Sequence, residues 1–113
     1  MDDAGYQRGL ELFNRGEFFD AHEVLEDVWR AAPAGEKKFL QGLIQVAVGL
    51  HHYSRGNREG ARSLLARANR NLSTYPGRHA GIKLAEVRLQ VEQWVSALEK
   101  GGAVPELPRI SGA

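Results

Sequence analysis

One stretch of the chain, residues 36–54, is apolar around almost its whole circumference when it is drawn as a helix. Its apolar residues recur at helical spacing and leave a single polar stripe. A helix of this kind is stable in water only when other helices surround it. Gln45 and Gly49 interrupt its longest apolar part, which is far shorter than the ~20 apolar residues of a membrane span. The stretch therefore predicts the central, buried helix of a bundle.

Four more segments have helical spacing, and helix-breaking residues separate them. Gly16, Gly56 and Gly101 follow such segments, and glycine is the residue that most often closes a helix. Pro33 disfavours helical backbone at the residue before it. The fold class is therefore all-α, a compact bundle of about five helices. The predicted helices cover residues 3–15, 17–32, 36–54, 58–74 and 80–99.

The first four predicted helices form an internal repeat at an offset of 40 residues. Each copy reads helix, Arg-Gly turn, helix, and it resembles a tetratricopeptide-type helical hairpin, with a period longer than the usual ~34 residues. Two copies do not make a solenoid, so the repeat predicts two antiparallel hairpins followed by a C-terminal helix. The matching pairs include Gly9-Leu10 with Gly49-Leu50, Arg15-Gly16 with Arg55-Gly56, and Leu25 with Leu65.

A single domain is expected for residues 1–100, because 113 residues is the length of one domain. Residues 101–113 are expected to form an extended or disordered tail, since Pro105 and Pro108 disfavour helix. Three apolar residues are able to pin this tail to the bundle: Val104, Leu107 and Ile110.

The composition excludes several kinds of site. The chain contains no cysteine, which removes disulfides, thiolate zinc sites and cysteine nucleophiles. It has no phosphate-binding glycine loop, and no Ser/His/Asp order of a nucleophilic triad stands out. No cofactor is expected. The amino end lacks a basic leader followed by an apolar run. A cytoplasmic protein without a membrane partner is therefore expected.

Charge is divided unevenly along the chain. Residues 1–36 carry nine acidic and three basic side chains, a net charge of −6, whereas residues 37–113 carry twelve basic and five acidic ones, a net charge of +7. The two halves can neutralise each other within the fold or across a homodimer interface. Alternatively, the arginine-rich face of the helix at 58–74 binds a polyanion such as nucleic acid. Its arginines are Arg58, Arg62, Arg67 and Arg70.

Two polar residues interrupt the apolar arc of the helix at 17–32. On a helical wheel His22 and Glu26 fall within this arc, next to Trp29 and one turn apart on the same face. Glu23 falls outside the arc and is expected to lie in solvent. A half-buried carboxylate needs a partner, because desolvating it alone is costly.

The polar stripe of the central helix consists of Gln41, Gln45 and His52. Gly42 and Gly49 lie beside it and leave a groove that another helix or a ligand can approach closely. We expect the polar pair of the preceding helix to face the two glutamines across the contact between these helices, because glutamine amides can donate hydrogen bonds to a carboxylate.

Three interpretations of this polar cleft are open. It can be a hydrogen-bonded network that fixes the register of the helices. It can bind a small polar ligand or a peptide. It can also hold a divalent metal for a hydrolase, with His22, Glu26 and His52 as ligands and Glu26 or Glu23 as the base. The segment from His22 to Glu26 is similar to the zinc-protease signature His-Glu-x-x-His, but Glu26 replaces the second histidine.

The residues around these polar groups match a known pattern. Residues 13–30, 39–53 and 55–57 together resemble the bacterial and archaeal family catalogued as domain of unknown function 309. The resemblance covers residues 6–75 and implies a compact all-α bundle. It implies no established activity, substrate or cofactor. The resemblance also implies that the family's signature positions in this chain are His22, Glu23, Glu26, Trp29, Gln41 and Gln45.

These observations favour a non-enzymatic binding or interaction module whose site is the polar cleft between the helices at 17–32 and 36–54. Its ligand is a small molecule or a protein partner. The alternatives are the metal-dependent hydrolase and the polyanion-binding arginine face, so the sequence leaves open whether the protein is an enzyme. The candidate binding residues are His22, Glu23, Glu26, Trp29, Gln41, Gln45 and His52.

Overall fold

The computed structural model describes the whole chain, residues 1–113, and it is all-helical, as predicted. None of its helices combines the length and the apolar run that crossing a membrane requires. The five helices are α1 (Asp3–Asn14), α2 (Phe18–Arg30), α3 (Ala34–Ser54), α4 (Arg58–Leu72) and α5 (Leu84–Lys100).

The largest difference from the predicted ranges is the start of α5, which begins at Leu84 rather than at residue 80. His79 and Ile82 exchange two backbone hydrogen bonds, of 3.1 Å and 3.0 Å. Between them Ala80 and Gly81 have φ angles of 48° and 75°. Such left-handed backbone makes a tight turn that a right-handed helix cannot pass through.

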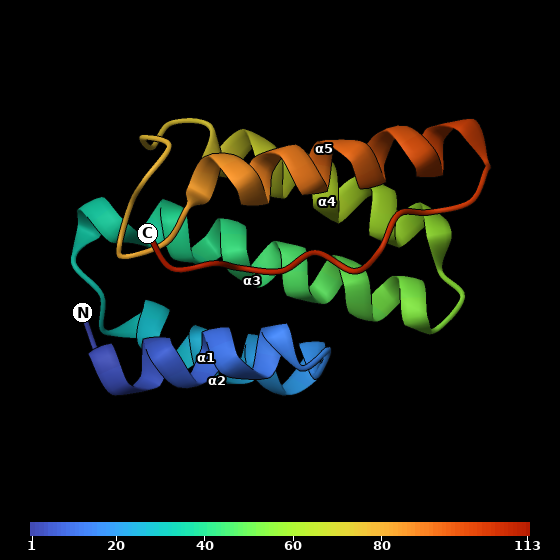
Figure 1. The fold of residues 1–113 in the computed structure, drawn as a ribbon. Coiled ribbons are helices and arrows are strands. Elements are labelled where there is room, and N and C mark those ends of the chain that lie inside the picture. Colours follow the sequence, from blue (N-terminus) through green and yellow to red (C-terminus); the bar gives the residue numbers. More distant parts are fainter.

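The helices form two hairpins, as the internal repeat predicted. Each helix packs against the next one along the chain, and α3 lies in the middle (Figure 1). Both hairpin turns use the same backbone bond: Glu17 N donates to Leu12 O at 3.0 Å, and Asn57 N donates to His52 O at 2.9 Å. The glycine before each donor has a positive φ, of 78° and 82° respectively, which closes the preceding helix.

The helices α3 and α4 approach each other closely because α3 has glycine where they meet. A Cβ atom on Gly42 would lie 2.6 Å from Leu72 Cδ2, and one on Gly49 would lie 3.1 Å from Leu65 Cδ2. Both leucines are fully buried. The predicted glycine groove is therefore confirmed, and a helix fills it.

The last residues, 101–113, leave α5 and run back along α3 as an extended segment (Figure 1). Ile110 is only 5% exposed and Val104 packs against the core, as predicted. Leu107, in contrast, is 51% exposed. Pro108 occupies the inward position beside it, because successive side chains of an extended segment point to opposite sides.

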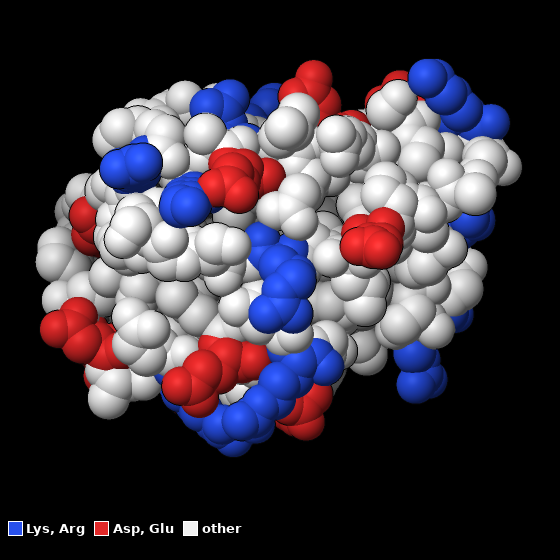
Figure 2. All heavy atoms as spheres, in the orientation of Figure 1, with Lys and Arg blue, Asp and Glu red and all other residues white.

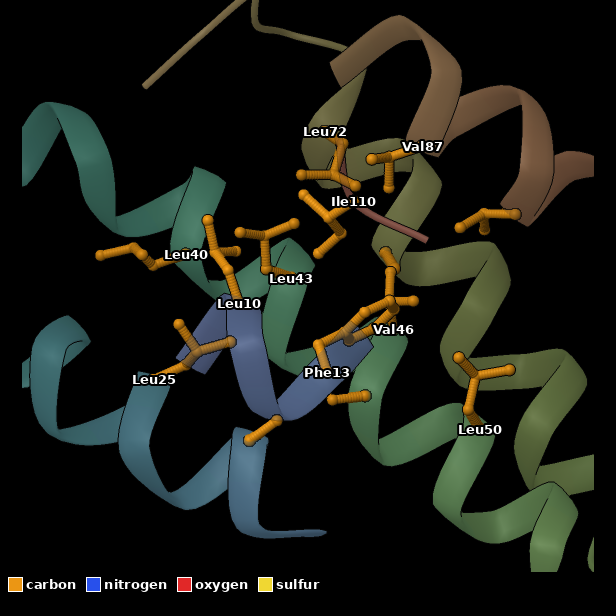
Figure 3. Packing of buried hydrophobic residues seen from close by; sticks show 14 of the residues in the cluster. Leu10, Phe13, Leu25, Leu40, Leu43, Val46, Leu50, Leu72, Val87 and Ile110 are labelled. Carbon is orange, nitrogen blue, oxygen red and sulfur yellow. The ribbon is translucent and has the colours of Figure 1, made fainter. Parts of the chain in front are cut away.

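The core lies between this segment and the helices. Figure 3 shows Ile110 of the tail among Leu43 of α3, Leu72 of α4 and Val87 of α5. Each buried aliphatic side chain of this size contributes about 1.5–3 kcal/mol to stability. The tail is thus part of the same core as the helices.

Replacing Gly42 by alanine should destabilise the fold, because the new methyl group overlaps the buried side chain of Leu72. We expect the free energy of unfolding, measured by urea denaturation, to fall by about 1–3 kcal/mol. Gly35, in the first turn of the same helix, is the control, since a Cβ there meets nothing within 4 Å. Gly35→Ala should be neutral or stabilise by up to about 1 kcal/mol. Equal effects of the two substitutions would contradict the close approach of α3 and α4.

Candidate functional site

His22 and Glu26 of α2 lie side by side, as their spacing predicted. The imidazole Nε2 is 3.1 Å from Glu26 Oε2, and Nδ1 is 2.9 Å from the carbonyl oxygen of Phe19. Both ring nitrogens therefore face oxygen atoms, one of a carboxylate and one of a backbone carbonyl. The two side chains are 21% and 41% exposed, and Glu23 next to them is exposed as predicted. A pair this open contributes at most about 1 kcal/mol to stability.

Phe19 connects this pair to the central helix. The centroid of its ring lies 5.2 Å from that of His22 and 5.3 Å from that of His51 on α3. The phenylalanine nevertheless remains 49% exposed. His51, rather than His52, is therefore the histidine of α3 that reaches α2.

Near the other end of α2, Trp29 makes the contact with α3. Lys37 Nζ, on α3, lies 4.6 Å from the centroid of the indole and donates to Trp29 O at 2.7 Å. The indole Nε1 is buried without a hydrogen-bond partner, which costs about 1–3 kcal/mol and which phenylalanine would avoid. We call the surface formed by Phe19, His22, Glu23, Glu26 and Trp29, with Lys37 and His51 at its two ends, the α2 face.

The glutamines of the polar stripe do not join His22 and Glu26. Gln45 Oε1 accepts a hydrogen bond of 2.8 Å from Asn71 Nδ2 on α4, and Gln41 is exposed. The reason is the glycine groove: α4 fills it, so the stripe beside the groove is turned towards α4. A helical wheel gives the angle between residues of one helix, but it does not say which neighbour covers each side.

The predicted metal ligands are also separated. His52 lies at the turn between α3 and α4, where its Nδ1 is 3.4 Å from Asn57 Nδ2. No group of three or more histidine, aspartate and glutamate side chains in the chain is arranged to hold a metal ion. The set of His22, Glu26 and His52 is therefore not assembled, because the two helices present these residues to different neighbours.

A second polar cluster, which the sequence analysis missed, joins the start of α3 to the loop before α5. His79 Nε2 is 2.8 Å from Glu36 Oε2, and their side chains are only 20% and 28% exposed. The imidazole also lies 4.8 Å from the rings of both Phe39 and Tyr75, measured between centroids. Loop residues 75–83 have no helical periodicity, so their sequence carries no signal of this contact.

Tyr6 of α1 completes this cluster. Its hydroxyl donates to Ala80 O at 2.9 Å, and the residue is only 2% exposed. Burial, and after it the negative charge of Glu36, raise the pKa of Tyr6 above its ordinary value. The folded protein therefore holds the Tyr6 proton more tightly than the unfolded chain does.

Two arginines of α4, Arg62 and Arg70, lie near acidic side chains. Arg62 pairs with Glu59, and this hydrogen bond lowers the pKa of the glutamate. A groove of about 610 Å³ runs between α4 and α5 and mixes both signs. Figure 2 likewise shows blue and red side chains interspersed over one face of the molecule. The charged residues that line the groove are Arg70, Arg88, Glu92, Glu99 and Lys100.

Two antiparallel hairpins and a fifth helix, with a histidine–glutamate pair on the second helix, define a small helical-bundle domain. The chain belongs to the family described as a domain of unknown function (DUF309), which matches residues 6–64. The match contains the whole α2 face, whereas α5 and the tail lie outside it.

Two curated relatives come from bacteria. An uncharacterized protein of Aquifex aeolicus is 35% identical over 96 residues, which cover 84% of this chain and 28% of the relative. The uncharacterized protein YpuF of Bacillus subtilis is 40% identical over 64 residues, which cover 56% of this chain and 37% of the relative. The chain thus spans about a third of the length of these relatives, and neither name states an activity.

The raised pKa of Tyr6 predicts how stability responds to alkaline pH. The stabilisation is complete below the unfolded pKa of about 10 and is lost as the pH rises towards the folded pKa. Tyr6→Phe should lower the free energy of unfolding at pH 7 by about 1 kcal/mol, through the lost hydrogen bond. Above about pH 10 the free energy of unfolding of Tyr6→Phe should fall less steeply with pH than that of the parent, by up to ~1.4 kcal/mol per pH unit.

Urea denaturation between neutral and alkaline pH measures both effects. Tyr53→Phe is the control at pH 7, because the Tyr53 hydroxyl makes no hydrogen bond within the chain and its removal should leave stability unchanged. Parallel curves for the parent and Tyr6→Phe would show that Tyr6 does not resist ionisation.

Proposed function

We propose that this domain is a non-enzymatic interaction module that binds a protein partner through the α2 face. The observation that carries the proposal is Phe19, which is 49% exposed although a histidine ring flanks it on each side. An aromatic side chain open to solvent within a polar surface is typical of the anchor residues of protein interfaces. The cysteine-free composition supports placing this module in the cytoplasm.

The charges around Phe19 indicate the chemistry of the partner. Glu26 has His22 and Arg30 within ion-pair distance, but Asp20 and Glu23 are exposed and have no cationic partner in the chain. Acidic side chains beside an apolar anchor favour a partner that presents a basic residue next to an apolar one. The net charge of −6 over residues 1–36 adds long-range attraction for such a partner.

The shape of the surface supports a macromolecular partner over a small molecule. Four of the five main hollows of the molecule lie along α4, α5, the tail and the loop before α5, and the fifth lies between the tail and the turn that joins α1 to α2. None of them includes a residue of the α2 face. Small ligands are usually held in concave sites. The matching region is also only part of each longer relative, as expected of a module that is joined to other segments.

The two alternatives have less support. A metal-dependent hydrolase needs a set of ligands that the helices do not bring together. A polyanion site on α4 would have to tolerate Glu59, Glu92 and Glu99, which lie among its arginines. Like charges of this kind weaken binding to phosphates.

A random-peptide phage library selected on the purified domain tests this proposal. We expect the selected peptides to carry lysine or arginine next to an aromatic or aliphatic residue. Phe19→Ala should weaken their binding at least about tenfold, or ~1.4 kcal/mol, and Glu23→Gln should weaken it measurably, because they remove the anchor and an unpaired charge.

Two matched variants on α5 provide the controls for this selection. Leu89 is 55% exposed and Glu92 is an exposed glutamate, so Leu89→Ala and Glu92→Gln remove the same kinds of side chain from a different surface. Both variants should keep the affinity of the parent, measured by fluorescence polarisation with the selected peptides. A library that yields no ligand, or ligands that bind equally well to Phe19→Ala, would overturn the proposal.

A further inference from the structure

The C-terminal segment is held mainly through its backbone. Asn14, the last residue of α1, makes two hydrogen bonds to one residue of this segment with its side-chain amide. Its Nδ2 donates to Ile110 O at 2.9 Å, and its Oδ1 accepts from Ile110 N at 2.8 Å. A side chain that satisfies both the N–H and the C=O of one residue recognises extended backbone whatever the side chain of that residue is.

A side chain of α5 makes the same pair of hydrogen bonds on the other side of the segment. Gln90 of α5 donates from Nε2 to Arg109 O at 2.9 Å and accepts from Arg109 N at 2.9 Å. One turn further along α5, Trp94 Nε1 donates to Glu106 O at 2.9 Å. Consecutive residues of the segment are therefore clamped from α5 and from α1. The segment lies between these helices, and α3 forms the floor beneath it (Figure 1).

Only two side chains of the clamped segment are buried. Ile110, 5% exposed, lies in the core among leucine and valine side chains of three helices (Figure 3). Pro108 is buried as well, whereas Leu107 and Arg109 between and beside them are exposed. The groove thus requires an extended backbone, a proline and, two residues later, an aliphatic residue.

The segment is joined to α5 by glycines. Gly101 ends the helix with a φ of 70°, and Gly102 follows it. A Cβ on either glycine would meet nothing within 4 Å. Between this point and Glu106, the only hydrogen bond to the segment's backbone from a side chain is that of Arg58 to Gly102 O, at 3.0 Å. A linker of this composition allows the segment to leave the groove without unwinding α5.

We propose that the groove between α1 and α5 is a peptide-binding site, that residues 105–111 are its internal occupant, and that an extended segment of a partner protein with a Pro-x-aliphatic sequence replaces them. The partner segment satisfies Asn14, Gln90 and Trp94 with its own backbone and fills the pocket of Ile110. The tethered tail competes with the partner segment for the groove at an effective concentration of the order of millimolar. A free segment must therefore bind the groove more tightly than the tail does in order to replace it. This site is separate from the α2 face.

The test cuts the tether but keeps every residue of the chain. A specific protease site placed between Gly101 and Gly102 of the full-length protein turns the tail into a separate peptide after cleavage. The probe is a fluorescein-labelled synthetic peptide with the sequence of residues 103–113. We expect the cut protein to bind one labelled peptide per chain, and the uncut protein to bind it at least about tenfold more weakly.

Variants of the protein and of the peptide distinguish binding through these contacts from nonspecific adhesion of the peptide. In the cut protein, Asn14→Ala should weaken binding about tenfold or more, because two hydrogen bonds to the peptide are lost. Asn71→Ala is the matched control, since its amide bonds to Gln45 far from the groove, and it should leave binding unchanged. A peptide carrying Ile110→Ser should not bind, whereas one carrying Leu107→Ser should bind like the parent.

A second labelled peptide tests the partner. It retains Pro108 and Ile110 and replaces the other positions, and we expect it to bind within about tenfold of the parent peptide, because the clamps contact backbone. Failure of this peptide, insensitivity to Asn14→Ala, or loss of the helical circular dichroism when the cut tail dissociates would each overturn the proposal. A dimer of the uncut protein that forms with exchanged tails would also overturn it, in favour of a second copy of the chain as the occupant.

Discussion

The contact between α3 and α4 is the constraint on which the other helices depend. Because α3 is apolar on most sides, it must be covered from several directions, and its glycines decide which helix comes closest. Gly42 and Gly49 let the leucines of α4 pack directly against the α3 backbone. With that side taken, α2 covers a second side, and the tail runs along another (Figure 1). The arrangement of the other elements around α3 thus follows from the positions of its glycines.

The same contact decides what the polar residues do. Gln45 lies beside the glycines, so α4 draws it into a hydrogen bond with Asn71. His22 and Glu26 are left with partners on their own helix, and Phe19 reaches across to His51. The result is an open acidic surface around an exposed aromatic ring rather than a closed polar cleft. This openness is the reason why we propose a macromolecular partner rather than an enclosed small ligand.

The two proposed binding surfaces differ in the chemical groups that they present. The α2 face presents side chains, and all of it lies within residues 6–64, the part that matches the family. The groove holding the tail presents amide and indole groups that bind backbone, and Gln90 and Trp94 lie beyond the matched part. The two proposed sites share no residue, so each can be tested without changing the other.

Local sequence determined the helices, the two hairpins and the pairing of His22 with Glu26, because spacing within a helix and glycine at its end act over a few residues. It also determined that Glu23 is exposed. Only the tertiary structure decided that Gln45 bonds to α4, that His79 reaches Glu36, and that the tail fills a groove between α1 and α5. These contacts join residues that are 26 to 96 positions apart, and no periodicity within one segment records which distant neighbour will cover it.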